Sequence, residues 1–168
     1  DIRTPARAPQ SMWERVPEAV EHLATLGLYI DDQPALRLAD VKRKVAQVRQ
    51  HAGRIDAVVI DYVQLMEGDG DNRHQSLSAI AAGLKAAAKT FGVPIILLSQ
   101  LNREADKLNS PPRLEHLRES GGIEEAADIV ALLWREHRRK PSEHNKHDAQ
   151  LEFVKHKNGA TDTVRLWF

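Results

Sequence analysis

Three continuous apolar runs constrain the fold of this chain more strongly than any other feature of its sequence. They occupy residues 57–60, 93–98 and 129–134, and they are rich in valine, isoleucine and leucine. A run without alternating polar residues is typical of a strand that is buried on both faces, as in a parallel sheet. Helix-like or polar sequence separates the runs, so the chain is predicted to have an α/β fold, with a mostly parallel sheet flanked by helices.

Two amphipathic helices are predicted from apolar residues that recur at three- and four-residue spacing. They cover residues 38–48 and 77–91, and a glycine follows each of them, as is common where helices end. Near the C-terminus, two alternating runs flank Asn158-Gly159, a pair that favours an antiparallel β-hairpin. Residues 28–30 form one more short, strand-like apolar run.

The size and composition fit one globular domain. The chain has 168 residues and no cysteine, which excludes disulfides and cysteine-based zinc sites. We expect residues 27–168 to form the main domain and residues 1–26, which contain three prolines, to form a helical or irregular segment of it. The sequence has neither an apolar run of about 20 residues nor a secretory leader, which predicts a cytoplasmic protein without a membrane partner.

The charge balance excludes a protein that binds nucleic acid through an overall positive charge. Lysine and arginine total 24, aspartate and glutamate also total 24, and the formal net charge is zero. Any contact with a polyanion must therefore be local.

Two predicted strands end in polar side chains that can contact a nucleotide. Asp61 follows residues 57–60, and Gln100 follows residues 93–98. Open α/β sheets bind ligands beyond the carboxyl ends of their strands. There a carboxylate can hold Mg²⁺ through water, and a glutamine can hydrogen-bond a γ-phosphate or its attacking water. Taken singly, a turn-capping aspartate and a glutamine that finishes a strand are the more common explanations.

Two further patterns suit anions. Lys155 and Lys157 lie two residues apart on a predicted strand, so both face the same side and can bracket an anion. Solvated lysines that protect an edge strand give the same pattern. Residues 118–122 precede a predicted helix at 123–127, whose first backbone amides can bind phosphate or simply begin a helix capped by Ser120.

In their order along the chain, these pieces resemble the C-terminal motor domain of the DnaB-type replicative DNA helicases. That domain has a RecA-like P-loop NTPase fold. The resemblance runs from about residue 27, through the Walker B strand, to residue 168. It rests on these segments: Leu28-Tyr29-Ile30-Asp31-Asp32, Val59-Ile60-Asp61-Tyr62-Val63-Gln64-Leu65-Met66, Asp71-Asn72-Arg73, Leu84-Lys85, Val93-Pro94, Leu98-Ser99-Gln100-Leu101-Asn102-Arg103, Leu117-Arg118-Glu119-Ser120-Gly121, Ile123-Glu124, Ala127-Asp128, Lys155, Asn158-Gly159 and Thr163-Val164.

The resemblance implies an ATP site that is shared between neighbouring subunits of a homo-hexamer. Asp61 matches the Walker B carboxylate that holds Mg²⁺ through water. Gln100 matches the sensor of the γ-phosphate. Lys155 and Lys157 match residues that reach the ATP of the neighbouring subunit.

The resemblance also implies a grip on single-stranded DNA in a central channel. Arg118, Glu119 and Gly121 match one channel loop, and Asn72 and Arg73 match the other. A motor must move on any sequence, so contacts to phosphate and sugar are expected rather than contacts to base edges. A helicase loader and other replisome proteins are further expected partners.

The sequence departs from the family pattern at the ATP site. The 168 residues contain no Gly-x-x-x-x-Gly-Lys-[Ser/Thr] phosphate loop, and the glutamate that activates water is also missing. Lys157 stands where the family usually has arginine, which keeps the charge but not the forked geometry. We therefore expect a fragment of a longer helicase that is inactive alone. The alternatives are a recombinase-type RecA-like ATPase and a non-hydrolysing DNA-binding or assembly relic of the helicase fold.

Overall fold

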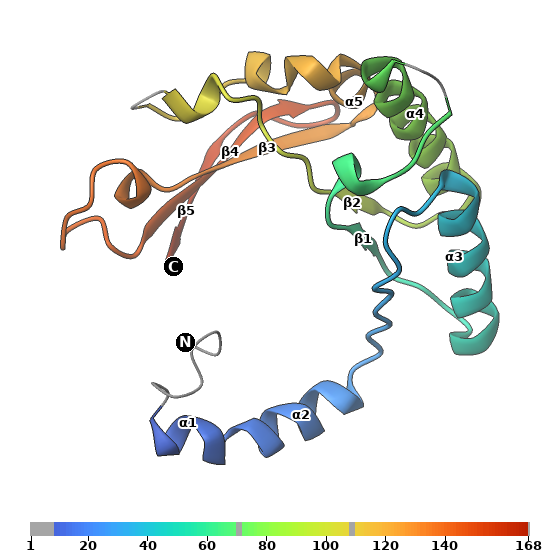
Figure 1. The fold of residues 1–168 in the computed structure, drawn as a ribbon, viewed down its shortest axis with the longest axis horizontal. Helices are drawn as coiled ribbons and strands as arrows, with labels where there is room; N and C mark the ends of the chain where they lie inside the picture. Colours follow the sequence, from blue (N-terminus) through green and yellow to red (C-terminus); the bar gives the residue numbers. More distant parts are fainter. Residues whose placement is uncertain (1–8, 70–71, 108–109, 168) are drawn as a thin grey trace.

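The structure is a computed structural model that describes residues 9–69, 72–107 and 110–167. The helices and strands in chain order are α1 (Gln10–Glu14), α2 (Val16–Thr25), α3 (Leu38–Ala52), β1 (Val58–Ile60), α4 (Arg73–Phe91), β2 (Ile95–Leu97), α5 (Gly121–Ala126), β3 (Ile129–Trp134), β4 (Asp148–His156) and β5 (Thr163–Trp167). Short 3₁₀ helices are η2 (Val63–Leu65), η3 (Ala105–Lys107), η4 (Leu114–Ser120) and η5 (Glu136–Arg138). The elements form an open arc, with α1 and α2 at one end and the strands β3 to β5 at the other (Figure 1).

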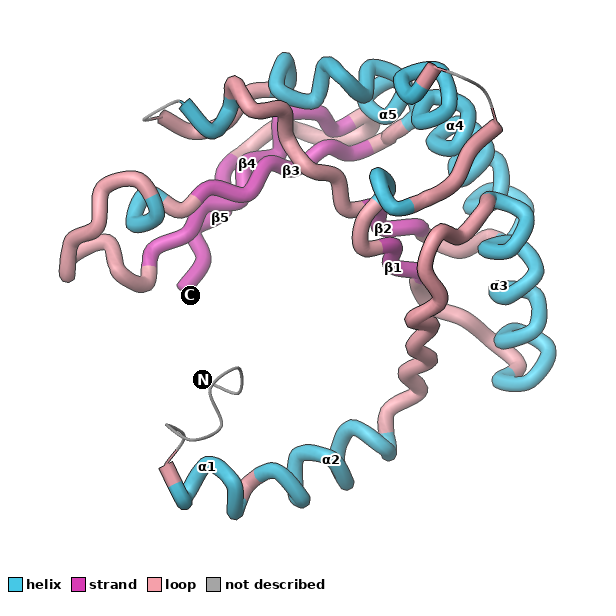
Figure 2. Tube along the Cα trace, viewed as in Figure 1, coloured by secondary structure: helices cyan, strands magenta, loops and turns pink. Residues whose placement is uncertain are grey.

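Strands β1 and β2 form a parallel pair, as the apolar runs predict. Val59 lies opposite Ile96, at the middle of the pair. One face of the pair packs against α3 and α4, which lie on the outer side of the arc while the strands lie on its inner side (Figure 2). On the other face, Val59 and Ile96 are 61% and 54% exposed. The sequence predicted burial on both faces, and only one is covered because no described element packs on the second.

The predicted ends of α3 and α4 are confirmed. Gly53 caps α3 with a φ of 80°, and Gly92 caps α4 with a φ of 65°. Both φ values lie in the left-handed region, where glycine avoids the steric cost of a side chain. At its start, α4 is capped by Asn72, whose side chain accepts a hydrogen bond from the backbone N of His74 at 2.9 Å.

Strand β3 joins a different sheet from the one that the sequence suggested. It pairs antiparallel with β4, and β4 pairs antiparallel with β5. In the described ladders, β3 has no pairing with β2, so this chain has a two-stranded parallel sheet and a three-stranded antiparallel one. The predicted hairpin is confirmed, with residues 157–162 connecting β4 and β5. The α/β class holds, and the antiparallel part is larger than expected.

The described part of the N-terminal segment is helical, with one interruption. Arg15 separates α1 from α2, and Pro17 lies in the first turn of α2. Residues 28–30 form no strand, because no described strand lies beside them to supply hydrogen bonds. This part contacts α3 through the ring of Tyr29, which lies 6.3 Å from that of His51. Among the described helices, none has the length and apolar character needed to cross a lipid bilayer.

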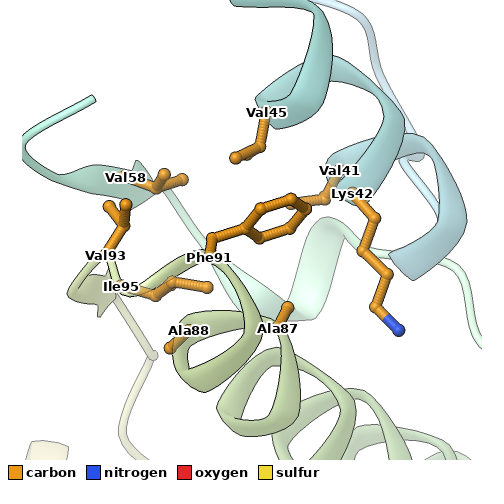
Figure 3. A pocket seen from close by; sticks show the side chains of 9 residues that line it. All are labelled: Val41, Lys42, Val45, Val58, Ala87, Ala88, Phe91, Val93 and Ile95. Carbon is orange, nitrogen blue, oxygen red and sulfur yellow. The ribbon is translucent and has the colours of Figure 1, made fainter. Parts of the chain in front are cut away.

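A small cavity of about 10 Å³ lies inside the core between the helices and the parallel strands. Its lining is almost wholly apolar (Figure 3) and comes from α3, β1, α4, β2 and the segment that leads into β2: Val41, Lys42, Val45, Val58, Ala87, Ala88, Phe91, Val93 and Ile95. A space this small holds one water at most, and an apolar lining gives water no partners. The cavity is therefore a packing feature, and it contains none of the predicted site residues.

Candidate functional site

Asp61 and Gln100 lie at the same edge of the parallel sheet, as predicted. Backbone hydrogen bonds continue just past the paired residues, from Leu98 N to the Ile60 carbonyl at 2.9 Å and from Val63 N to the Leu98 carbonyl at 3.0 Å. These bonds hold the two strand ends together. Both predicted side chains are exposed there, so a ligand can approach them.

Gln64, which the sequence did not single out as a site residue, joins the two strand ends. Its Nε2 donates to Ser99 Oγ at 3.0 Å and to the Gln100 carbonyl at 3.3 Å. Its Oε1 accepts from the Gln100 backbone N at 3.2 Å. Gln64 thus fixes the Gln100 backbone relative to the loop after Asp61 and leaves the Gln100 side chain exposed. The only signal for it was its place in the segment that resembles the family, because a partner 36 residues away leaves no local pattern.

Asn72 and Arg73, the residues predicted on a channel loop, lie at the start of α4 and have structural contacts of their own. Asn72 caps the helix, and Arg73 forms hydrogen bonds with the loop after β1. The Arg73 guanidinium donates to the carbonyl oxygens of Gln64 and Met66, the latter at 3.2 Å. The start of α4 is therefore tied to the loop that follows Asp61. Contact of these two residues with DNA stays a prediction.

Arg118, Glu119 and Gly121, the other predicted DNA contacts, lie where η4 passes into α5. The sequence predicted that this helix begins at residue 123. In the structure the backbone is already helical from η4 onward, so the helical segment begins earlier. The side chains of residues 118–121 lie outside what the structure describes. The next residue, Gly122, packs closely on α4, since a Cβ there would come within 2.6 Å of Ser78 Cα.

Lys155 lies on β4 beside α5, and its ammonium group binds carbonyl oxygens of that helix. Its Nζ donates to the carbonyl oxygen of Glu124 at 2.7 Å and to that of Glu125 at 3.5 Å. These carbonyls belong to the last turn of α5, where a cation is favoured. Lys157 follows the end of β4, and its side chain is exposed.

The predicted ATP-site residues therefore fall into two groups within one chain. Asp61 and Gln100 follow the strands of the parallel pair, whereas Lys155 lies on β4 of the three-stranded sheet and Lys157 follows that strand. Among the described residues, no hydrogen bond or ion pair was found that connects one group to the other.

The donor set at Asp61 fits Mg²⁺ bound mainly by a nucleotide. In the described parts of the chain, no three histidine, aspartate or glutamate residues gather as a metal-binding group. A divalent ion beside Asp61 would take its remaining ligands from water and phosphate oxygens. Mg²⁺ commonly binds in this way, with one or two carboxylates, retained waters and substrate phosphates.

Comparison with known proteins identifies relatives along the whole chain. The family model described as the DnaB-like helicase C-terminal domain matches residues 1–168. The replicative DNA helicase DnaB of Geobacillus stearothermophilus is 38% identical over 172 residues, which cover 100% of this chain and 37% of the relative. DnaB of Leifsonia xyli is 43% identical over 147 residues, which cover 84% of this chain and 31% of the relative. The chain thus spans about a third of the length of these relatives.

Solved structures show the same relationship in three dimensions. One of them, an ATPase domain, superposes with a TM-score of 0.89 at 30% identity, over 99% of this chain and 61% of that one. A DnaB-like replicative helicase, solved in a study of its interactions with primase, gives a TM-score of 0.88 at 30% identity. The superposition covers 96% of this chain and 40% of the helicase chain. The fold is therefore that of RecA-like helicase ATPase domains, and the chain belongs to the DnaB-like helicase C-terminal domain family.

Proposed function

We propose that this chain is the motor part of a replicative DNA helicase that couples ATP hydrolysis to movement along single-stranded DNA and to duplex unwinding. The observation that carries the proposal is the junction of the two parallel strands, where Gln64 fixes the Gln100 backbone beside the loop after Asp61. This junction can register a phosphate at one strand end and pass the change to the other. The protein is proposed to act as a homo-hexameric ring in the cytoplasm.

The residues of this chain divide the work at the nucleotide. Asp61 would hold, through water, the Mg²⁺ that accompanies ATP, and the exposed Gln100 side chain would hydrogen-bond the γ-phosphate or the attacking water. Mg²⁺ supplies charge neutralisation at the phosphates when it is bound. The phosphate loop and the water-activating glutamate come from a segment outside these 168 residues. For this reason we propose that the chain hydrolyses no ATP alone.

Lys155 and Lys157 are proposed to stabilise negative charge on the nucleotide of the neighbouring subunit. In this structure Lys155 binds the last turn of α5 instead, so it must leave these carbonyls to reach a phosphate. Lysine supplies the charge without the two-pronged geometry of arginine. We therefore expect charge, more than precise hydrogen-bond geometry, to account for its contribution.

The grip on DNA is proposed to lie at the start of α5, with help from the start of α4. Arg118, Glu119 and Gly121 supply one loop of the channel, and Asn72 and Arg73 lie on the other. Because the chain has no net charge, affinity must come from these local contacts repeated around the ring. A loader or other replisome protein is a proposed partner of the assembled ring.

The test uses the full-length protein that contains this chain. We expect ATP hydrolysis stimulated by single-stranded DNA, and unwinding of a forked duplex. The change Asp61→Asn should lower the hydrolysis rate by about 10- to 100-fold, as when a group that acts on a metal through a second shell is removed.

The matched control is Asp56→Asn, which removes a carboxylate near the opposite end of the same strand, where it pairs with Arg54. Its hydrolysis rate should stay near that of the unaltered protein. A full-length protein that binds DNA without hydrolysing ATP would refute the motor and favour a non-hydrolysing relic. Strand exchange without unwinding would instead favour a recombinase.

A further inference from the structure

Asp128 connects three parts of the fold beside the C-terminal lysines. It lies in the short connection between α5 and β3. Its carbonyl oxygen accepts a hydrogen bond from the backbone N of Lys157 at 2.9 Å. Its carboxylate forms an ion pair with Lys85 of α4. One residue thus holds the backbone of Lys157 and is itself held by α4.

Lysines gather at this corner of the molecule. Lys85 and Lys89 lie one turn apart on α4, and Lys155 and Lys157 lie at the end of β4. The pKa of Lys85 lies below its ordinary value because desolvation, and then the positive charges of Lys89, Lys157 and Lys155, disfavour its charged form. The Asp128 carboxylate offsets part of this repulsion.

The ion pair between Lys85 and Asp128 is poorly suited to stabilising the fold. The two side chains are 27% and 48% exposed, and ion pairs that water reaches contribute little to stability. Its geometric consequence is larger, because it fixes the residue that closes the ladder between β3 and the end of β4. Ile129 pairs with His156, and the bond from Lys157 to Asp128 extends this pairing by one residue.

We propose that Lys85 and Asp128 act together as positioning residues for Lys157, and hold it where it contacts the phosphates of a nucleotide on the neighbouring subunit. Lys157 is the group that touches phosphate, and the ion pair acts only through it. This inference rests on the proposed function, because it requires both the ring and ATP. Neither Lys85 nor Asp128 leaves a local signal for this role, since they lie 43 residues apart in the chain.

The experiment uses the full-length protein assembled as a ring. Asp128→Asn and Lys85→Met should each lower kcat for ATP hydrolysis about tenfold, as expected when a positioning partner is lost. Lys85→Arg, which keeps the ion pair, should restore most of the rate. Lys89→Met is the matched control, because it removes a lysine from the same face of α4, one turn away. It should change kcat less than twofold.

A second measurement separates positioning from a general structural role. In a Lys157→Ala background, Asp128→Asn should lower kcat no further, because both changes act on one group. Ring mass and thermal midpoint should stay unchanged in all these variants. The inference is overturned if Asp128→Asn still lowers kcat by the same factor in the Lys157→Ala background. It is also overturned if the variants lose activity only because they no longer assemble into a ring. If the unaltered ring hydrolyses ATP and Lys157→Ala slows it but Asp128→Asn does not, the positioning role fails while the proposed function stands.

Discussion

Gln64 is the residue through which one strand end is held against the other. Three hydrogen bonds connect its side chain to Ser99 and to the backbone of Gln100. Truncation leaves the Gln100 amide without this partner, at a cost of about 1 kcal/mol for a partly exposed group. We expect Gln64→Ala to make the amide hydrogen of Gln100 exchange about fivefold faster, as measured by native-state hydrogen exchange.

The matched control at this scale is Gln47→Ala. Gln47 is an exposed glutamine, and its side chain makes a hydrogen bond with Arg43 on the surface of α3. Its loss should leave the exchange of the Gln100 amide unchanged. Equal exchange at Gln100 in Gln64→Ala and in the unaltered protein would show that backbone bonds alone hold the strand ends.

At the scale of elements, α5 depends on a close approach to α4. Gly122 lies so near Ser78 that an added methyl group would collide with backbone. Overpacking of this kind typically costs about 1–3 kcal/mol. Gly122→Ala should therefore lower the thermal midpoint. It should also weaken the binding of single-stranded DNA, because the predicted DNA contacts Arg118 and Gly121 lie at the start of this helix.

Gly27→Ala is the control for this change, because nothing lies within 4 Å of a Cβ at that position. The thermal midpoint and the binding of single-stranded DNA, measured at one salt concentration, should both stay close to those of the unaltered protein. If Gly122→Ala matches Gly27→Ala in stability and in binding, the packing of α5 on α4 does not set the DNA loop.

At the scale of the whole molecule, the uncovered face of the parallel pair is an exposed apolar surface. Val59 and Ile96 lie opposite each other and are both exposed. An apolar patch of this kind binds partners or hydrophobic dyes. We expect the 168-residue chain to enhance the fluorescence of such a dye. Val59→Thr with Ile96→Thr should lower that signal several-fold without altering the circular dichroism of the helices.

Ile30→Thr is the control at this scale. Ile30 is more exposed than either strand residue, but it lies in an irregular segment that belongs to neither sheet. Its replacement should barely change the dye signal. An equal loss in this variant would mean that scattered apolar side chains bind the dye, and that the strand face does not act as a patch.

Much of the fold follows from the sequence alone, because local structure depends on neighbours in the chain. Apolar spacing predicted α3 and α4, and the glycines at 53 and 92 predicted their ends, since few other residues accept a left-handed φ. The positions of Asp61 and Gln100 after two adjacent strands placed both at one sheet edge. The same reasoning put the two lysines on a separate strand.

Only the tertiary structure decided which distant segments meet. An apolar run can pair with a parallel or an antiparallel neighbour. The sequence suggested the parallel sheet for β3, whereas the structure pairs β3 antiparallel with β4. The bonds from Gln64 to Gln100 and from Lys85 to Asp128 join residues 36 and 43 positions apart. Such contacts depend on how helices and strands pack together. The spacing of apolar residues predicts only the local backbone conformation, so it cannot predict these long-range contacts.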